Sequence, residues 1–130
     1  MNRLRYGLAP AGHDARATTL EVRRLTAGAS EIAIGGDVTS ASEGRPIDAF
    51  ALASAEGARV IVLDFSRLEY MNSGGIGLLV TLLVRAQPKG QRLIAVGLSE
   101  HYRHILALTG LDRAIGIHET ATEALAAAGA

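Results

Sequence analysis

Cysteine and tryptophan are absent from the 130 residues, and aromatic residues make up only 4% of them. Without cysteine the chain has no disulfide, no thiol nucleophile and no cysteine-ligated zinc. This absence suits a reducing compartment, and we expect the protein in the cytoplasm. So few aromatic rings leave little surface on which nucleic acid bases could stack.

Net charge is missing as well, because 13 Lys and Arg residues balance 13 Asp and Glu residues. A neutral chain lacks the basic surface that binds nucleic acid or acidic membranes. The longest apolar run, 76–84, is about half as long as a membrane span. Residues 1–18 contain no apolar core of a secretory signal. We therefore expect no nucleic acid partner and no direct membrane insertion.

What is present is an alternation of strand patterns and helix patterns. A first strand is predicted at 19–25, and apolar residues at every second position predict another at 31–38. A continuous apolar run predicts a strand at 60–63 that is covered on both faces. Two further strands are predicted at 92–96 and 115–117. Helices are predicted at about 46–56, from residue 72 or 73 to 86, between Ser99 and Gly110, and at 121–128. Within the second of these helices, residues 76–86 are apolar nearly all round, which predicts a buried helix.

Strands that are separated by helices need crossover connections, and this order indicates an α/β fold. We predict a single domain over 19–130, with a mixed sheet of about four or five strands and about four helices packed mainly on one face. Gly35 and Gly36 within the second strand predict a bulge or a close backbone approach. Residues 1–18 show no periodicity and are predicted to form a flexible N-terminal tail.

The segment that carries most information follows the buried strand. The sequence DFS at 64–66 is expected to end that strand, and a short loop then leads to MNSGG at 71–75. Asn72 is a good N-cap because its side-chain oxygen can accept from the free amides of the first helical turn. Gly74 and Gly75 inside that turn cost on the order of 1 kcal/mol each relative to alanine. Such a cost indicates that something approaches the backbone closely there.

These motifs resemble the signature of STAS domains (sulfate transporter and anti-sigma factor antagonist domains), above all the stand-alone bacterial anti-sigma factor antagonists. The family pattern reads roughly D-L/F-S, then M-D-S-S/T-G-L/I-G and L-L. Here it stands as DFS at 64–66 and MNSGGIGLL at 71–79. GDVTSAS at 36–42 is similar to the family's G-E-L-D loop. GLS at 97–99, LALTGLD at 106–112 and EALAA at 123–127 extend the resemblance over about 19–128.

The resemblance implies a partner-switching cycle, with no catalytic residue, cofactor or metal in this chain. An anti-sigma factor that is also a serine kinase binds the unmodified domain, phosphorylates it and is then released. A metal-dependent serine phosphatase resets the domain. By motif match the phosphorylated residue is Ser73. The implied partner-binding surface consists of Asp37, Thr39, Met71, Asn72, Ser73, Gly74 and Gly75, and a homodimer stays open.

Two residues depart from the family pattern. Asn72 stands where the family has an acidic residue, and Gly74 stands where it has a second Ser or Thr. Both changes bear on kinase recognition, so two other readings stay open. One is a non-phosphorylated STAS subunit of a signalling assembly or of an ABC-type lipid transporter. The other is a sensor that holds a small anion at the helix N-terminus.

Other polar residues favour structural roles. Asp64 has no second carboxylate or histidine at a spacing that suggests a catalytic pair, so we expect it to bond loop amides. His101 and His104 lie three residues apart but lack further ligands for a metal. The run SGGIG at 73–77 lacks the Lys-Ser/Thr of a phosphate-binding loop, and the G-x-S-x-G turn of serine hydrolases is not met.

Overall fold

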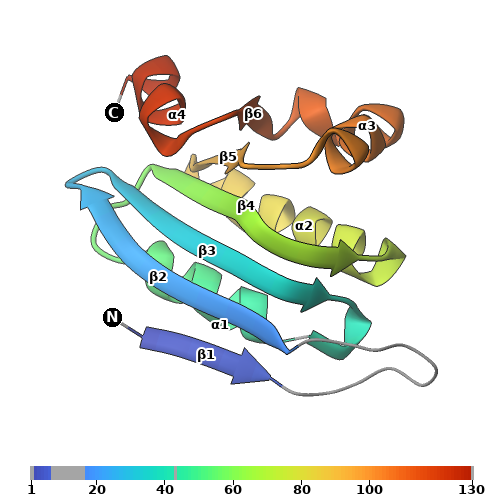
Figure 1. Ribbon diagram of the computed structural model, residues 1–130. Coiled ribbons are helices and arrows are strands. Elements are labelled where there is room, and N and C mark those ends of the chain that lie inside the picture. Colours follow the sequence, from blue (N-terminus) through green and yellow to red (C-terminus); the bar gives the residue numbers. More distant parts are fainter. Residues whose placement is uncertain (1, 7–16, 43, 130) are drawn as a thin grey trace.

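The computed structural model describes residues 2–6, 17–42 and 44–129, with side chains from residue 17 onward (Figure 1). The strands are β1 (Asn2–Tyr6), β2 (Thr18–Thr26), β3 (Ala29–Val38), β4 (Val60–Met71), β5 (Arg92–Val96) and β6 (Gly116–His118). The α-helices are α1 (Arg45–Ala53), α2 (Ser73–Ala86), α3 (Glu100–Thr109) and α4 (Ala121–Ala128). Three short 3-10 helices accompany them: η1 (Ser40–Ser42), η2 (Gln87–Lys89) and η3 (Leu111–Arg113).

The strands form one mixed sheet in the order β1-β2-β3-β4-β5-β6. The pairs β1–β2 and β2–β3 are antiparallel, and the pairs from β3 to β6 are parallel. The predicted α/β class, mixed sheet and helices are confirmed, and the predicted strands are all present.

The sixth strand, β1, comes from residues that the sequence analysis assigned to the tail. Asn2–Tyr6 pairs with residues 18–22 of β2. A strand edge offers a row of free backbone groups, so pairing there depends on the main chain more than on a clear side-chain pattern. Residues 7–16 lie outside the described residues, and the flexibility of that part of the tail stays a prediction.

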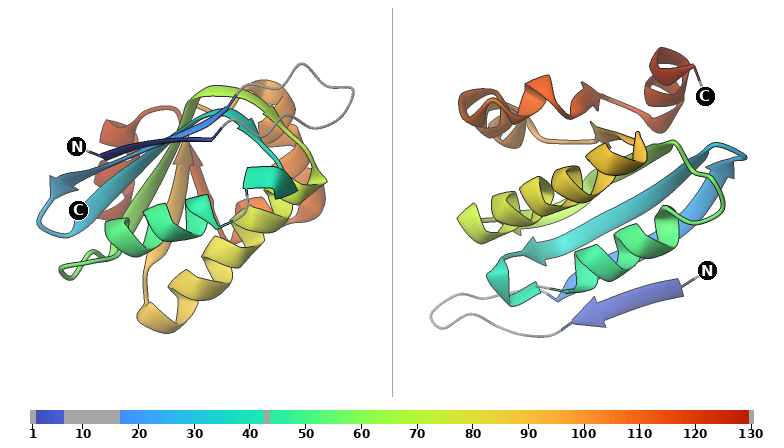
Figure 2. Two further views of the ribbon diagram at one scale, coloured as in Figure 1. Left: turned by 90° about the horizontal axis from the view of Figure 1, so that it is seen from below. Right: turned by 180° about the vertical axis from the view of Figure 1, so that it is seen from behind.

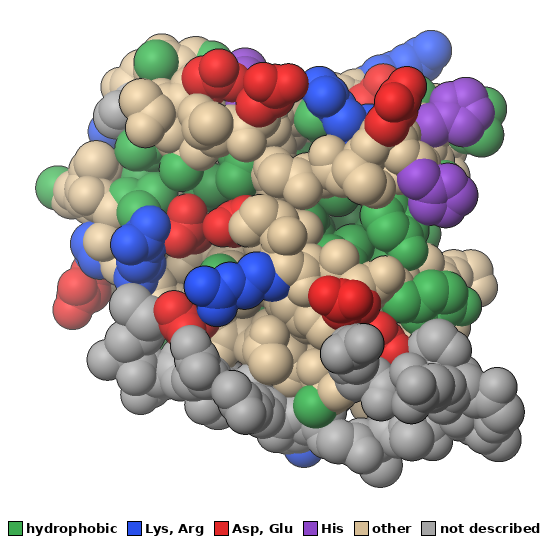
Figure 3. Space-filling view, in the orientation of Figure 1, with side chains coloured by type: hydrophobic (Ala, Val, Ile, Leu, Met, Phe, Trp, Pro, Cys, Tyr) green, Lys and Arg blue, Asp and Glu red, His purple; other side chains and the backbone are tan. Residues whose placement is uncertain are grey.

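Helices cover both faces of the sheet unequally. Helices α1 and α2 lie against one face, where the larger apolar core includes Phe50, Leu63, Leu82 and Leu106 of α3 (Figure 2). Helix α4 packs on the opposite face against β4, β5 and β6, around Ala124. The sheet face beside α4 carries acidic and basic side chains intermingled, and histidines project at the end near α3 (Figure 3).

Strand β4 is longer than predicted, because it continues from Val60 to Met71 instead of ending at 64–66. Its first part, up to Asp64, lies between β3 and β5. In its second part the described pairing is with β3 alone, and polar side chains face solvent, which gives a loop-like sequence.

Two register shifts between β3 and β4 flank Gly35 and Gly36, which confirms the predicted bulge. Gly36 has a φ of 72°, and a side chain there would overlap the carbonyl oxygen of Ala17. The bulge lets both strands run on together until Val38 pairs with Met71.

Candidate functional site

The carboxyl ends of two adjacent parallel strands create the site. Val38 at the end of β3 pairs with Met71 at the end of β4, and the amide of Asn72 donates to the Val38 carbonyl over 3.4 Å. Strand β3 leads directly into η1, and β4 leads into α2. The two loops that the motif match singled out therefore lie side by side at one edge of the sheet (Figure 1).

Helix α2 begins as predicted. Asn72 has an extended backbone (φ −102°, ψ −171°), and its Oδ1 accepts from the amide of Gly75 over 3.1 Å. Ser73 is the first helical residue and is exposed. The hydroxyl of Ser73 therefore stands at the positive end of the helix dipole, beside a side chain that is already engaged in capping.

The first turn of α2 is pressed onto the chain in front of it. A Cβ atom on Gly75 would lie 2.5 Å from Cγ of Met71 and would overlap the carbonyl oxygen of Val38. A Cβ atom on Gly74 would lie 2.6 Å from the backbone nitrogen of Ser40 in η1. The close approach that two glycines predicted is real, and the approaching group is this chain's own backbone.

Buried hydroxyl groups hold the η1 segment in place. The hydroxyls of Thr18 and Ser42 lie 2.7 Å apart, and Thr18 also donates to the carbonyl of Asp37. The amide of Thr39 donates to Ser42 Oγ over 3.1 Å, and Thr39 Oγ1 accepts from the amide of Ala41 over the same distance. Because most of these bonds are buried, η1 has a fixed shape beside Ser73.

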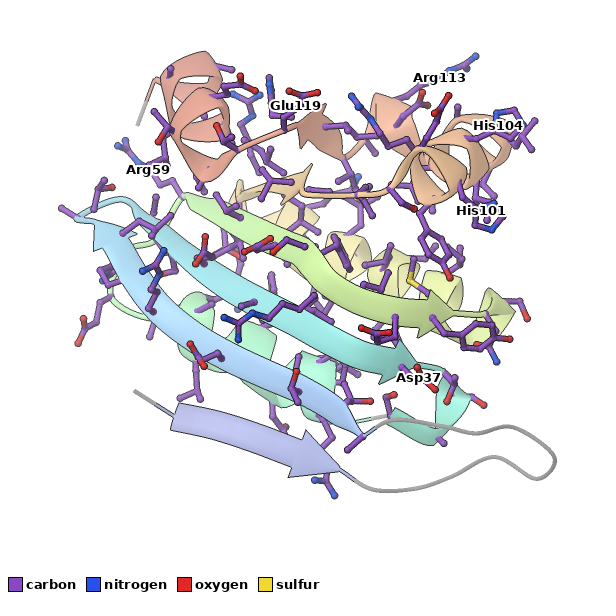
Figure 4. All side chains as sticks on the ribbon, viewed as in Figure 1. Asp37, Arg59, His101, His104, Arg113 and Glu119 are labelled. Carbon is purple, nitrogen blue, oxygen red and sulfur yellow. The ribbon has the colours of Figure 1, made fainter. Side chains whose placement is uncertain are left out.

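Asp37 and Thr39 were predicted to contact a partner. Both are buried: Asp37 lies near the end of β3 (Figure 4), and Thr39 lies between β3 and η1. The exposed residue of this loop is Ser40. No sequence pattern had singled out Ser40, Ser42 or Thr18 as site residues, although the motif GDVTSAS at 36–42 contains the first two.

A third segment joins the site through Tyr102 of α3. Its hydroxyl oxygen accepts from the amide of Met71 over 2.8 Å, immediately before the N-cap of α2. The ring of His101 packs edge-on against Tyr102, with ring centroids 4.9 Å apart. His101 and His104 point outward from α3, and both are exposed (Figure 4). Tyr102 lies on the helix predicted between Ser99 and Gly110, and it anchors the strand end that carries the site.

With this geometry in place, comparison with known families is decisive. A family model described as "Mlab, STAS domain" matches residues 12–119. The chain belongs to the STAS domain family. Ser73 lies within the matched residues, as do η1 and Tyr102.

Solved structures share this STAS fold at low sequence identity. An anti-sigma factor antagonist from Mycobacterium paratuberculosis is 23% identical, with a TM-score of 0.72 over 85% of this chain and 92% of its own. The anti-sigma factor antagonist SpoIIAA in its unphosphorylated form is 19% identical, with a TM-score of 0.68 over 85% and 97%. A sulfate transporter family protein from Wolinella succinogenes is 19% identical, with a TM-score of 0.69 over 82% and 89%.

In this STAS domain the predicted site residues gather at one place. Met71, Asn72, Gly74 and Gly75 surround the exposed Ser73; Met71 and Gly75 are buried, and Asn72 and Gly74 are half-buried. Asp64 lies elsewhere on β4, where its Oδ1 accepts from the amide of Ser66 over 2.9 Å, as the predicted structural role requires.

Two further findings concern the described residues only. Within them, no group of three or more His, Asp or Glu side chains is arranged to hold a metal ion. Among the same residues, no helix has the length and apolar character needed to cross a membrane.

Proposed function

We propose that this STAS domain is an anti-sigma factor antagonist that is switched at Ser73. The unmodified domain binds an anti-sigma factor with serine kinase activity, and phosphorylation of Ser73 by that kinase ends the complex. The observation that carries the proposal is an exposed serine at the capped start of α2, on a surface held by η1 and α3. Likeness of fold to antagonists such as SpoIIAA supports it.

The site suits phosphorylation without unfolding. A phosphate adds about −1.5 to −2 charge at neutral pH, and a helix N-terminus accommodates negative charge. Asn72 is neutral, so it repels a phosphate on Ser73 less than an aspartate would. Because the first turn of α2 is tightly packed, the added charge and bulk act on the partner at the interface rather than on the fold.

The chemistry belongs to the partners in this proposal. The kinase transfers the γ-phosphoryl group of ATP to Ser73 Oγ, the hydroxyl proton passes to a base of the kinase, and ADP leaves. A metal-dependent serine phosphatase returns the hydroxyl by hydrolysis. The domain itself supplies no catalytic residue and no cofactor. It acts in the cytoplasm, and by releasing a sigma factor it regulates transcription, for example under stress.

A charge-matched pair of variants tests the proposal. Ser73→Asp places a negative charge at the site, and Thr122→Asp places one on an exposed residue in the first turn of α4, away from it. In a pull-down from the native host, we expect the wild type and Thr122→Asp to recover an anti-sigma factor kinase. Ser73→Asp is expected to recover at least about tenfold less. Equal recovery by all three proteins would contradict the proposal.

A second candidate is a STAS subunit that is never phosphorylated, in a signalling assembly or an ABC-type lipid transporter. The departures at Asn72 and Gly74 favour it. This candidate predicts stoichiometric recovery of scaffold or transporter subunits in the same pull-down, with Ser73 unmodified.

A further inference from the structure

Gly74 and Ser40 lie so close together that no side chain fits between them. A Cβ atom on Gly74 would lie 2.6 Å from the backbone nitrogen of Ser40, 3.0 Å from its Cβ and 3.1 Å from its Cα. Real Cβ atoms essentially never approach other heavy atoms to 2.6 Å. Ser40 therefore occupies the space in which a side chain of residue 74 would begin.

Ser40 differs from its neighbours in the η1 segment. Thr39 and Ser42 are buried and hydrogen-bonded, whereas Ser40 is exposed. The hydrogen bonds of the Thr39 and Ala41 amides fix the backbone on both sides of Ser40. The hydroxyl of Ser40 is therefore presented at a fixed place, next to the first turn of the helix that carries Ser73.

We propose that Ser40 is a specificity-determining residue of the partner surface, whose hydroxyl takes the place of the Ser or Thr that this chain lacks at position 74. The inference rests on the proposed function, because it concerns the partner that binds at Ser73. That partner presents a hydrogen-bonding group to Ser40. A negative charge at Ser40 then blocks binding in the same way as a charge at Ser73.

The packing has a direct consequence for sequence. A glycine at 74 permits the close approach of η1, and any side chain at 74 pushes Ser40 outward. Residue 74 and residue 40 therefore determine this part of the surface together, although they are far apart in the chain. In this chain, with Gly74 beside it, Ser40 places a hydroxyl group on that part of the surface.

Variants at Ser40 test the inference with the anti-sigma factor kinase that the wild type recovers, purified and titrated against each protein. We expect Ser40→Ala to weaken binding by about fivefold, the loss of one interfacial hydrogen bond. Ser40→Asp is expected to weaken binding by more than about thirtyfold, through a buried unpaired charge. Thr122→Asp is the charge control and is expected to bind like the wild type.

The outcomes separate this inference from the proposed function. If Ser73→Asp loses the kinase but both Ser40 variants bind like the wild type, Ser40 is no determinant and the proposed function stands. If Ser73→Asp also binds like the wild type, the proposed function fails. Thermal unfolding of each variant checks that it is folded, which we expect because Ser40 and Thr122 are exposed.

A second pair of variants tests the packing without any partner. Gly74→Ala is expected to displace η1 and so to shift the backbone amide signals of residues 40–42 in an NMR spectrum. Gly77→Ala is the matched control in the same helix, where a Cβ would meet no described atom within 4 Å. Unchanged signals in Gly74→Ala would overturn the packing on which the role of Ser40 depends.

Discussion

Helix α2 has glycine both in its first turn and further along, but the first-turn glycines are crowded and the later one is not. Gly75 is buried against Val38 and Met71, whereas a Cβ on Gly77, two residues later, would meet no atom of the described chain within 4 Å. The first turn is shaped by the strand end and η1 in front of it, and the later turns are shaped by the sheet beneath. Glycine is therefore a structural requirement at the start of α2 and only a loss of helix stability further along.

Among variants that test this difference, Gly75→Ala should lower the stability of the domain most. The added methyl group has no space between Val38 and Met71, and overpacking of this kind lowers the free energy of unfolding by about 3 kcal/mol. Urea unfolding measures this loss of free energy, with Gly77→Ala as the control. Equal stability of the two variants would show that the first turn of α2 is not tightly packed.

Asn72→Ala should have a smaller effect, because it removes the cap and leaves the packing in place. The amide of Gly75 loses its acceptor, and we expect the free energy of unfolding to fall by about 1 kcal/mol. Asn72→Asp restores the family's acidic residue and keeps an acceptor, so thermal unfolding should show it at least as stable as the wild type. If Asn72→Asp lowers the stability of the domain as much as Asn72→Ala does, residue 72 does not act as a cap.

Tyr102→Phe should loosen the contact between α3 and the end of β4. It removes only the hydroxyl that accepts from the amide of Met71, at a cost of about 1 kcal/mol or less. Hydrogen exchange at the Met71 amide is the sensitive measurement, and we expect it to become faster. An unchanged exchange rate would mean that Tyr102 does not hold the end of β4.

Gly77→Ala should have the smallest effect, and in the opposite direction. Alanine is favoured over glycine in a helix by up to about 1 kcal/mol, and position 77 is exposed with room for a methyl group. Chemical unfolding should show a gain in stability. A loss would mean that this part of α2 is as crowded as its first turn.

Sequence rules that act locally predicted their features correctly. Asn72 caps α2, Ser99 caps α3 by accepting from the amide of Tyr102, and Gly110 ends α3 with a φ of 76°. Each depends on neighbours within a few residues in the chain, so the pattern alone suffices. The order of strands and helices followed from the same kind of local pattern.

Features that depend on distant residues were not predicted. The extension of β4 to Met71 depends on pairing with β3 beyond the bulge, and the position of Ser40 depends on its contact with Gly74. The predicted burial of α2 was wrong on one side, because Val80 and Val84 are 40% and 60% exposed. The helix covers the sheet with one face only, and its apolar composition did not reveal which residues face outward.

The central claim is that Ser73 is the residue through which this domain is switched. The most direct measurement is mass spectrometry of the wild-type chain isolated from its native host, during growth and under stress, with Ser73→Ala as the control. We predict phosphate on Ser73 in a fraction of the chain, a change in that fraction between conditions, and an anti-sigma factor kinase bound only to the unmodified form. A Ser73 that is never modified, in a chain bound stoichiometrically to scaffold or transporter subunits, would contradict the account.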